Sequence, residues 1–209
     1  LVEQYVSAFA GLTGELQQNS YYGFVEENQF VSPDLFITPS DQQYKAYGGL
    51  RGKVTNSTSY QIDASYSNTE TMALFKNNTI TASNRPYSFG NSFGVVYDNV
   101  STLTFGGRLD FDFNQKINLG VKGTYYSYKT TFEEEAWNLP NIDVAAFLDY
   151  KINDKFTAGA SLFFVGERKD ELTIYSTRFP ITDSEIINLD AYIDLNAYVD
   201  YQINNQFSA

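Results

Sequence analysis

The chain has 209 residues, which is enough for one domain or for part of a larger one. Its net charge is −11, and so acidic a surface repels phosphate backbones, which argues against a nucleic-acid partner. The sequence contains neither Cys nor His. Disulfides, Cys–His metal sites and His-dependent nucleophilic catalysis are therefore excluded within it, and we predict no catalytic residue, no metal and no cofactor.

Alternation of apolar and polar residues dominates the sequence, and no apolar run approaches the roughly 20 residues of a membrane-spanning helix. Successive side chains of a strand point to opposite faces, so such alternation predicts strands that separate two media. In chain order the pattern predicts these strands: 4–16, 44–54, 60–66, 103–113, 117–126, 143–152, 156–165 and 188–203, with a ninth beginning at the C-terminal end. The clearest is 188–203, where Asp, Asn, Gln and Tyr alternate with apolar residues.

Short and long connections alternate along the chain. Tight polar turns fall near 55–58, 114–116, 153–155 and 204–205. Long connections are predicted at roughly 17–42, 68–98, 129–141 and 169–186. Asn and Asp suit the turns because both tolerate left-handed backbone. Short turns on one side and long loops on the other are typical of an antiparallel meander that crosses a membrane.

Two faces can be assigned on this prediction. The polar face is expected to line a wet lumen, with Arg108, Asp110, Asp112, Lys122, Asp143, Asp149, Asp190, Asp194 and Asp200. The apolar face is expected to meet lipid, with Leu109, Phe113, Leu119, Val121, Leu148, Tyr150, Phe156, Leu162, Leu195, Val199 and Tyr201. Aromatic residues near the short turns, Phe207 included, fit an interfacial girdle. A soluble lipocalin-like barrel or β-sandwich also alternates, with its apolar face inward.

The fold class is therefore all-β, an antiparallel up-and-down transmembrane β-barrel. About eight strands and the start of a ninth are visible. A closed eight-stranded barrel fills its interior with side chains, whereas this inward face is rich in Asp, Asn, Thr, Gly and Ser. The sequence also appears cut at both ends. We expect residues 1–209 to be part of a single barrel domain that is larger than this chain, without a plug domain.

Four stretches and the Asp–aromatic turns carry a family resemblance. The stretches are 28–38, 93–100, 125–128 and 137–140, and the turns follow Asp112, Asp149 and Asp200. Their texture resembles the barrel region of TonB-dependent receptors of the Bacteroidota type. The resemblance implies a 22-stranded barrel with an N-terminal plug and a TonB-contacting segment, neither of which lies in these residues.

Three further groups of residues have both a functional and a simpler interpretation. The triple acid Glu133-Glu134-Glu135 is a divalent-cation or lipopolysaccharide-linked site, or a solvated loop. Asp190, Asp194 and Asp200 contact a plug or a cationic solute, or form a hydrated wall. Aromatic residues crowd the first long connection and form a binding surface, or a loop that folds over the mouth and packs on itself: Tyr21, Tyr22, Phe24, Phe30 and Phe36.

The leading hypothesis is the barrel of an outer-membrane transporter that takes up a solute in a Gram-negative bacterium. Its partners would be lipid, lipopolysaccharide, its own plug domain and TonB. The first alternative is a structural subunit of an outer-membrane complex, with other subunits of that complex as partners. The second is a soluble or adhesive β-protein.

Overall fold

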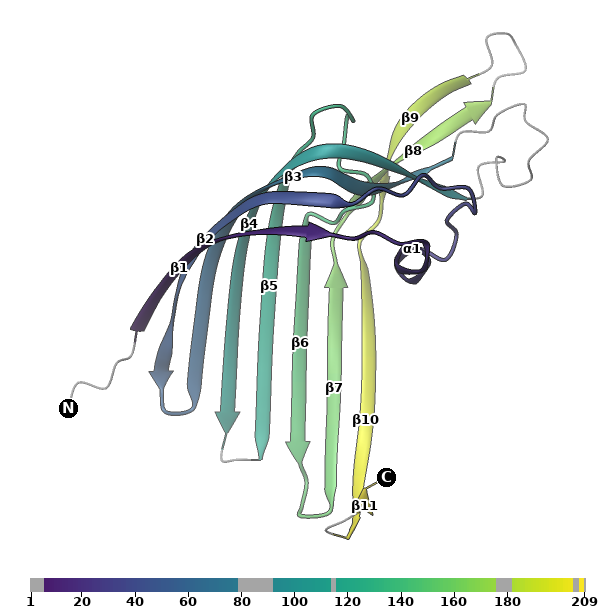
Figure 1. Cartoon of the computed structure of the whole chain (residues 1–209). Coiled ribbons are helices and arrows are strands. Elements are labelled where there is room, and N and C mark those ends of the chain that lie inside the picture. Colours follow the sequence, from purple (N-terminus) through teal and green to yellow (C-terminus); the bar gives the residue numbers. More distant parts are fainter. Residues whose placement is uncertain (1–5, 79–91, 114–115, 176–181, 205–206, 209) are drawn as a thin grey trace.

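A curved antiparallel sheet forms most of the molecule (Figure 1). The computed structural model describes residues 6–78, 92–113, 116–175, 182–204 and 207–208. The sheet has nine strands in the order β1-β2-β3-β4-β5-β6-β7-β10-β11, and β8 pairs with β9 in a separate hairpin. The strands are β1 Val6–Gln17, β2 Ser40–Thr55, β3 Thr58–Asn77, β4 Phe93–Phe113, β5 Ile117–Lys129, β6 Ile142–Lys151, β7 Phe156–Val165, β8 Arg168–Tyr175, β9 Thr182–Leu189, β10 Tyr192–Asn204 and β11 Phe207–Ser208. The helix α1, Tyr21–Glu27, lies between β1 and β2.

The predicted all-β meander is confirmed. Neighbours in the chain pair in turn, from β1 with β2 to β6 with β7. Within the described residues, no helix is long and apolar enough to cross a membrane. The short turns lie at one end of the strands and the long connections at the other, as Figure 1 shows. The predicted turns at 114–116 and 204–205 fall largely outside the described residues.

One predicted strand is wrong in its extent. Residues 188–203 were expected to form one continuous strand, but the chain leaves it at Asp190 and Ala191. Leu189 pairs with Arg168 in the β8–β9 hairpin, whereas Tyr192 pairs with Val165 of the wall. The chain therefore changes sheets between these two pairs. The predicted long connection at 169–186 is largely the hairpin of β8 and β9.

Strands β3 and β4 continue far beyond their predicted ends, with 20 and 21 residues. Their pairing runs up to Asn77 opposite Phe93, across a bulge between Thr69 and Met72. Thr71 in this bulge has a φ of 50°. The described parts of the predicted connection at 68–98 are therefore mostly strand, because beyond the bilayer a strand no longer needs an apolar face. Residues 79–91 of that connection lie outside the described residues.

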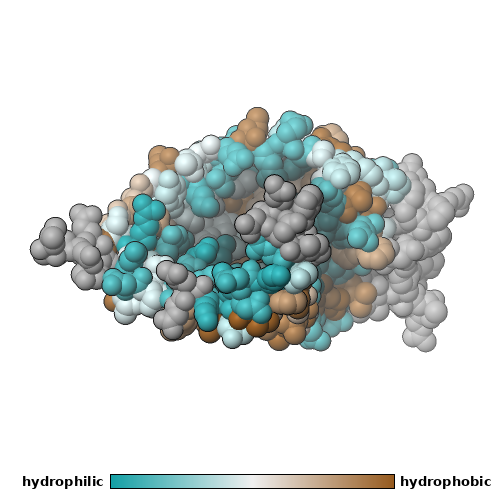
Figure 2. Space-filling model, turned by 90° about the horizontal axis from the view of Figure 1, so that it is seen from below, coloured by the Kyte–Doolittle hydropathy of each residue, from teal (hydrophilic) through white to brown (hydrophobic). Residues whose placement is uncertain are grey.

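The register separates the two faces as expected. Cross-strand partners share a face, and Gln61, Arg108 and Lys122 are successive partners across β3, β4 and β5. On the other face the corresponding partners are Tyr60, Leu109 and Val121. Seen from the short-turn end, hydrophilic residues gather in the hollow and hydrophobic residues lie along the outer margin (Figure 2).

No described part of the chain covers the apolar face. Leu195 is 67% exposed and Val199 is 64% exposed. Among the described residues, the buried hydrophobic cluster consists of Leu74, Val100 and Trp137, all near the long-connection end. A soluble barrel would bury its apolar face instead, so the sheet lacks the core that such a barrel requires.

A glycine on the polar face makes room for a tyrosine that links three strands. Tyr198 of β10 lies over Gly159 of β7, and its hydroxyl donates a hydrogen bond to Asp149 of β6. A Cβ atom at Gly159 would overlap the Tyr198 ring.

We therefore expect Gly159→Ala to displace Tyr198 and to destabilise the wall by about 1–3 kcal/mol, because the added methyl overpacks a filled space. The measurement is the temperature at which the protein loses its compact form on a gel in detergent. Gly107→Ala is the matched control, because nothing lies within 4 Å of the added Cβ there. Equal melting of both variants would contradict the expectation.

Candidate functional site: the polar face and the mouth

The concave polar face carries a cavity of about 390 Å³ near the short turns. It is lined from β2 through β6, so strands four places apart in the sheet surround one space. Several predicted lumen residues meet there. Arg108 binds both carboxylate oxygens of Asp110, at 2.7 and 2.8 Å. Asp112 and Asp149 line the same cavity.

The register puts the other predicted lumen residues on this face, with one exception. Asp143 pairs with Thr124, two residues beyond Lys122 on the same face. Asp194 and Asp200 lie on β10, in step with Tyr198. Asp190 belongs to no strand, since it lies in the link between the hairpin and the wall. The polar pattern of 188–203 alone could not reveal that interruption.

All the residues predicted to meet lipid lie on the opposite face. Near the short turns Phe156 and Tyr201 pack with ring centroids 4.7 Å apart. A second aromatic level lies higher, where Tyr44 and Tyr66 approach to 6.2 Å. On β4, Phe105 and Phe113 are eight residues apart, which corresponds to about 26 Å of strand. Two aromatic levels with apolar residues between them are typical of the girdles that border the apolar band of a membrane barrel.

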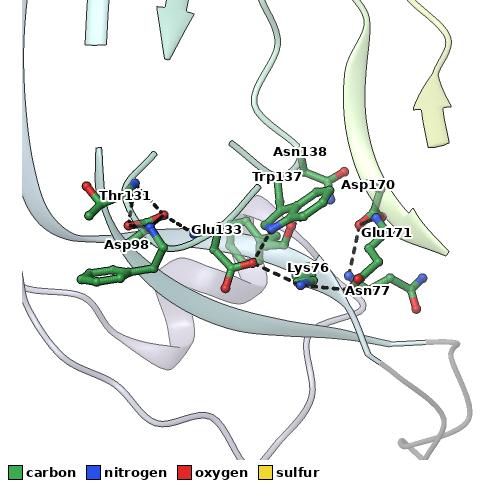
Figure 3. A network of polar contacts seen from close by, with 11 residues as sticks. Lys76, Asn77, Asp98, Thr131, Glu133, Trp137, Asn138, Asp170 and Glu171 are labelled. Atoms are coloured by element: carbon green, nitrogen blue, oxygen red, sulfur yellow. Dashed lines mark hydrogen bonds and ion pairs between the residues drawn. The ribbon is translucent and has the colours of Figure 1, made fainter. Parts of the chain in front are cut away.

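At the mouth, a buried carboxylate fixes the connection between β5 and β6. Asp98 of β4 is 1% exposed. Its oxygens accept the backbone N–H groups of Thr131, at 3.1 and 3.2 Å, and Phe132, at 3.0 Å from both oxygens. A third bond of 2.7 Å comes from the N–H of Glu133 (Figure 3). Because Asp98 shares the face of Arg108, this loop lies on the polar side of the wall.

Trp137 closes the loop onto the same side. Its side chain is 2% exposed and packs with Leu74 and Val100. Its Nε1–H donates to Glu133 at 2.7 Å, and the ring centroid lies 4.9 Å from the Lys76 ammonium. Indole burial and a cation over the ring together make this residue the apolar anchor of the loop.

Lys76 joins the loop to the β8–β9 hairpin. Its Nζ lies 3.1 Å from Glu133 and 2.9 Å from Glu171. The backbone N–H of Asn77 donates to Asp170, a residue of β8 that is 3% exposed, at 3.2 Å. Figure 3 shows Lys76 between the two acids.

A second set of contacts holds the loop against β3 and β8. The side-chain amide of Asn138 donates to the carbonyl of Phe75 at 2.8 Å. The backbone N–H of Asn138 donates to the carbonyl of Lys169, also at 2.8 Å. Lys169 also pairs with Glu135. We call residues 130–141, with their contacts to the upper part of β3 and to the base of β8, the mouth bridge. It links β3 of the wall to the separate β8–β9 hairpin, which follows β7 in the chain.

Two residues of the triple acid thus hold the loop in place, and the third is solvated. Glu133 and Glu135 each pair with a lysine, and Glu134 is exposed. No grouping of three or more metal-ligating residues occurs in the part of the chain that the structure describes.

The aromatic residues of the first connection divide in the same way. Phe24 is 4% exposed and meets Phe75 edge-on at 5.7 Å. Tyr22 and Phe30 remain 72% and 66% exposed. Phe24 thus packs on β3 and not on other aromatic residues of the connection, and the packing of the connection on itself stays a prediction.

The charges of Lys76 and Glu171 stabilise each other. Burial alone would raise the pKa of Glu171, but hydrogen bonds from Lys76 and Ser184 and the Lys76 charge outweigh it, so this pKa lies below its usual value. Burial would lower the pKa of Lys76, but the two acids raise it above its usual value. Both groups lie beyond the membrane band, in the upper part of β3 and in β8.

Comparison with known proteins shows the fold. No family model matches the chain, and no curated protein matches it. The pyoverdine outer membrane receptor FpvA of Pseudomonas aeruginosa matches 98% of this chain at 13% identity, with a TM-score of 0.59 over 28% of the receptor. The siderophore receptor PirA of Acinetobacter baumannii matches 98% at 12% identity, with a TM-score of 0.60 over 34% of that chain. A variant of the ferric enterobactin receptor PfeA of P. aeruginosa matches 98% at 10% identity, with a TM-score of 0.57 over 32%.

The fold is that of an outer-membrane receptor barrel, in part. The chain spans about a third of these receptors or less. The matches agree with the predicted location in the outer membrane of a Gram-negative bacterium. They give no support to the narrower resemblance to the Bacteroidota type, since these receptors come from Pseudomonas and Acinetobacter.

Removing the Asp98 carboxylate should release the loop. In Asp98→Ala the partly buried N–H groups of Thr131, Phe132 and Glu133 lose their acceptor, and an amide left unpaired costs up to about 1–3 kcal/mol. We expect these amides to exchange with solvent at least roughly 10-fold faster. The measurement is hydrogen exchange read by mass spectrometry. Asp112→Ala, on the exposed lower part of β4, should leave the same amides protected. Unchanged exchange in Asp98→Ala would show that the carboxylate does not hold the loop.

The Lys76–Glu171 pair should stabilise the docking of the hairpin at intermediate pH, and this stabilisation should be lost at both extremes of pH. The Glu171 pKa is lowered, so its contribution is present above pH 4.5 and is lost as the pH falls through the lowered value. The Lys76 pKa is raised, so its contribution is present below pH 10.5 and is lost as the pH rises through the raised value. Emission from Trp137, the only Trp of the 209 residues, reports the change after subtraction of a Trp137→Phe sample. In Glu171→Gln the change of Trp137 emission at acid pH should be smaller. An identical change at acid pH in this variant would contradict the assignment.

Proposed function

We propose that the chain is part of the barrel wall of an outer-membrane receptor that takes up a solute. The observation that carries the proposal is the uncovered apolar face between two aromatic levels, because only lipid suits such a surface. The polar, hollowed face then forms one side of the solute path. Charges on that side, such as the paired Arg108 and Asp110, keep it hydrated.

Lipid and lipopolysaccharide would cover the apolar face, and water would fill the lumen. In this arrangement the predicted lumen residues, from Arg108 on β4 to Asp200 on β10, tune which solutes pass. Every backbone group in lipid must be paired, so a spanning sheet has to close. Among the described residues β1 pairs only with β2, and closure therefore calls for further strands beside it.

A plug domain and TonB complete the proposal. The resemblance in the sequence implies both, and the matched receptors are several times longer than this chain, which leaves room for them. Uptake would then begin with capture at the mouth, followed by passage when the plug moves. Because the lumen wall carries more acidic than basic residues, basic residues of a plug would suit it.

A pair of neighbouring substitutions tests the assignment of the faces. Leu195→Arg puts a charge on the lipid side and should cost about 2–4 kcal/mol near the middle of the bilayer. Asn196→Arg puts the same charge on the lumen side, near Asp194, and should be tolerated. The measurement is the fraction of protein in the outer membrane that runs as the compact form before heating. Equal fractions for the two variants would sink the assignment.

Uptake itself requires the whole protein. We expect it to stay in the outer membrane until detergent is added, to run faster unheated than boiled, and to be required for uptake of one class of solute. Comparing growth on candidate solutes with and without the gene measures this requirement. A fixed set of envelope partners without any uptake defect would favour the structural-subunit hypothesis instead. Release in plain buffer would favour a soluble β-protein.

A further inference from the structure

We propose that the mouth bridge is a fixed constriction that sets the size of the solute groups entering along this side of the lumen, with Asp98 as the residue that positions it. The inference rests on the proposed function. It goes further by assigning size selection to one loop that lies on the wall and to one carboxylate beneath it.

The position of the loop follows from the register. Asp98, Val100 and Thr102 alternate along β4 on the same face as Arg108, with no bulge in β4 between them. A loop whose amides bind Asp98, and whose Trp137 packs on Val100, must therefore lie on the lumen side of the wall. A loop that flared outward could make neither contact.

The bridge spans a wide part of the mouth. Lys76 and Asn77 of β3 reach Glu171 and Asp170 of β8, with four wall strands between β3 and the hairpin. Figure 1 shows the upper parts of β3 and β4 bending over toward β8 and β9. The loop at 130–141 contacts β3 through Glu133 and Lys76, and contacts β8 through Asn138 and Lys169.

The constriction is fixed rather than mobile. Loops that open easily have few buried contacts and exposed backbone hydrogen bonds. Here Trp137 is 2% exposed and Asp98 is 1% exposed, and three successive amides are tied to the carboxylate. Opening the bridge would expose an indole and would leave the Asp98 carboxylate with only the N–H of Asn99 in its own strand, so a passing solute group meets a set aperture.

The space next to the bridge gives the scale. A cavity of about 420 Å³ lies between the loop, β5 and the base of β8, with Tyr126, Tyr128, Glu134 and Arg168 in its lining. The two tyrosine rings are stacked, 5.9 Å apart and 11° from parallel. Cavities of about 300–1,000 Å³ hold small ligands. Groups of that size should pass, and bulkier ones should be held at the bridge.

The test measures access from outside the cell to one thiol below the bridge. The 209 residues contain no Cys, so Lys122→Cys supplies the reactive group on the lumen face of β5. Intact cells that carry the full-length protein, free of other accessible thiols, are treated with maleimides on polyethylene glycol chains of rising length. The readout is the longest chain that still labels the protein. Leu109→Cys, on the lipid side, is the control for entry by another route.

We expect small reagents to label Lys122→Cys, and long ones to fail. Adding Asp98→Ala should raise the longest labelling chain by at least two steps of the series, and Asp98→Asn, which keeps one acceptor oxygen, should raise it less. Asp112→Ala should not change it. If Asp98→Ala does not reach the membrane, the comparison rests on Asp98→Asn and on Trp137→Leu, which keeps the carboxylate.

An unchanged size limit, in a variant whose amides at 131–133 have lost their protection, would overturn the proposal, and so would labelling of Lys122→Cys by the longest reagents without any second change. Failure of the proposed function would look different. The protein would then leave the membrane in plain buffer, or Leu109→Cys and Lys122→Cys would react alike with every reagent.

Discussion

The alternating register in which neighbouring wall strands pair is the constraint on which the rest of the structure depends. A shift of one residue would exchange the faces of a strand. Leu109 would then lie in the hollow and Arg108 on the apolar side. The cross-strand partners of Arg108, Gln61 and Lys122, are polar as well, so the assignment of each strand reinforces that of the next.

Beyond the membrane band this constraint is relaxed, and a second kind of packing begins. The upper parts of β3 and β4 no longer need an apolar outer face, and a bulge at Thr69 to Met72 lets them bend over the mouth. The molecule thus has two regions that are stabilised in different ways. Lipid would support the wall from outside, whereas the mouth has a small interior of its own around Trp137, tied together by the charges of Asp98 and Lys76.

The sequence predicted the wall well because membrane strands must alternate. Strands such as 117–126 and 156–165, and the turns at 55–58 and 153–155, lie close to their predicted places. The mouth could not be predicted in this way. Asp98 and Lys76 lie in the stretch that the sequence pattern predicts to be a long connection, and their partners are distant in sequence. Nothing local distinguishes a buried carboxylate that binds amides of a distant loop from an exposed carboxylate. The hairpin of β8 and β9 was not predicted either, because a strand pair with water on both sides shows no alternation of apolar and polar residues.

The separation along the chain of the parts that meet in the mouth bridge also bears on the order of folding. Neighbouring wall strands join through hairpins, several of them tight, whereas Asn77 and Asp170 are 93 residues apart. Contacts at such separation form late, because the chain between them must first be ordered to reduce the entropy of closing the loop. The bridge can assemble only once β4 to β7 are in register. An assembled mouth bridge therefore indicates that this stretch of the wall has already folded in the correct register.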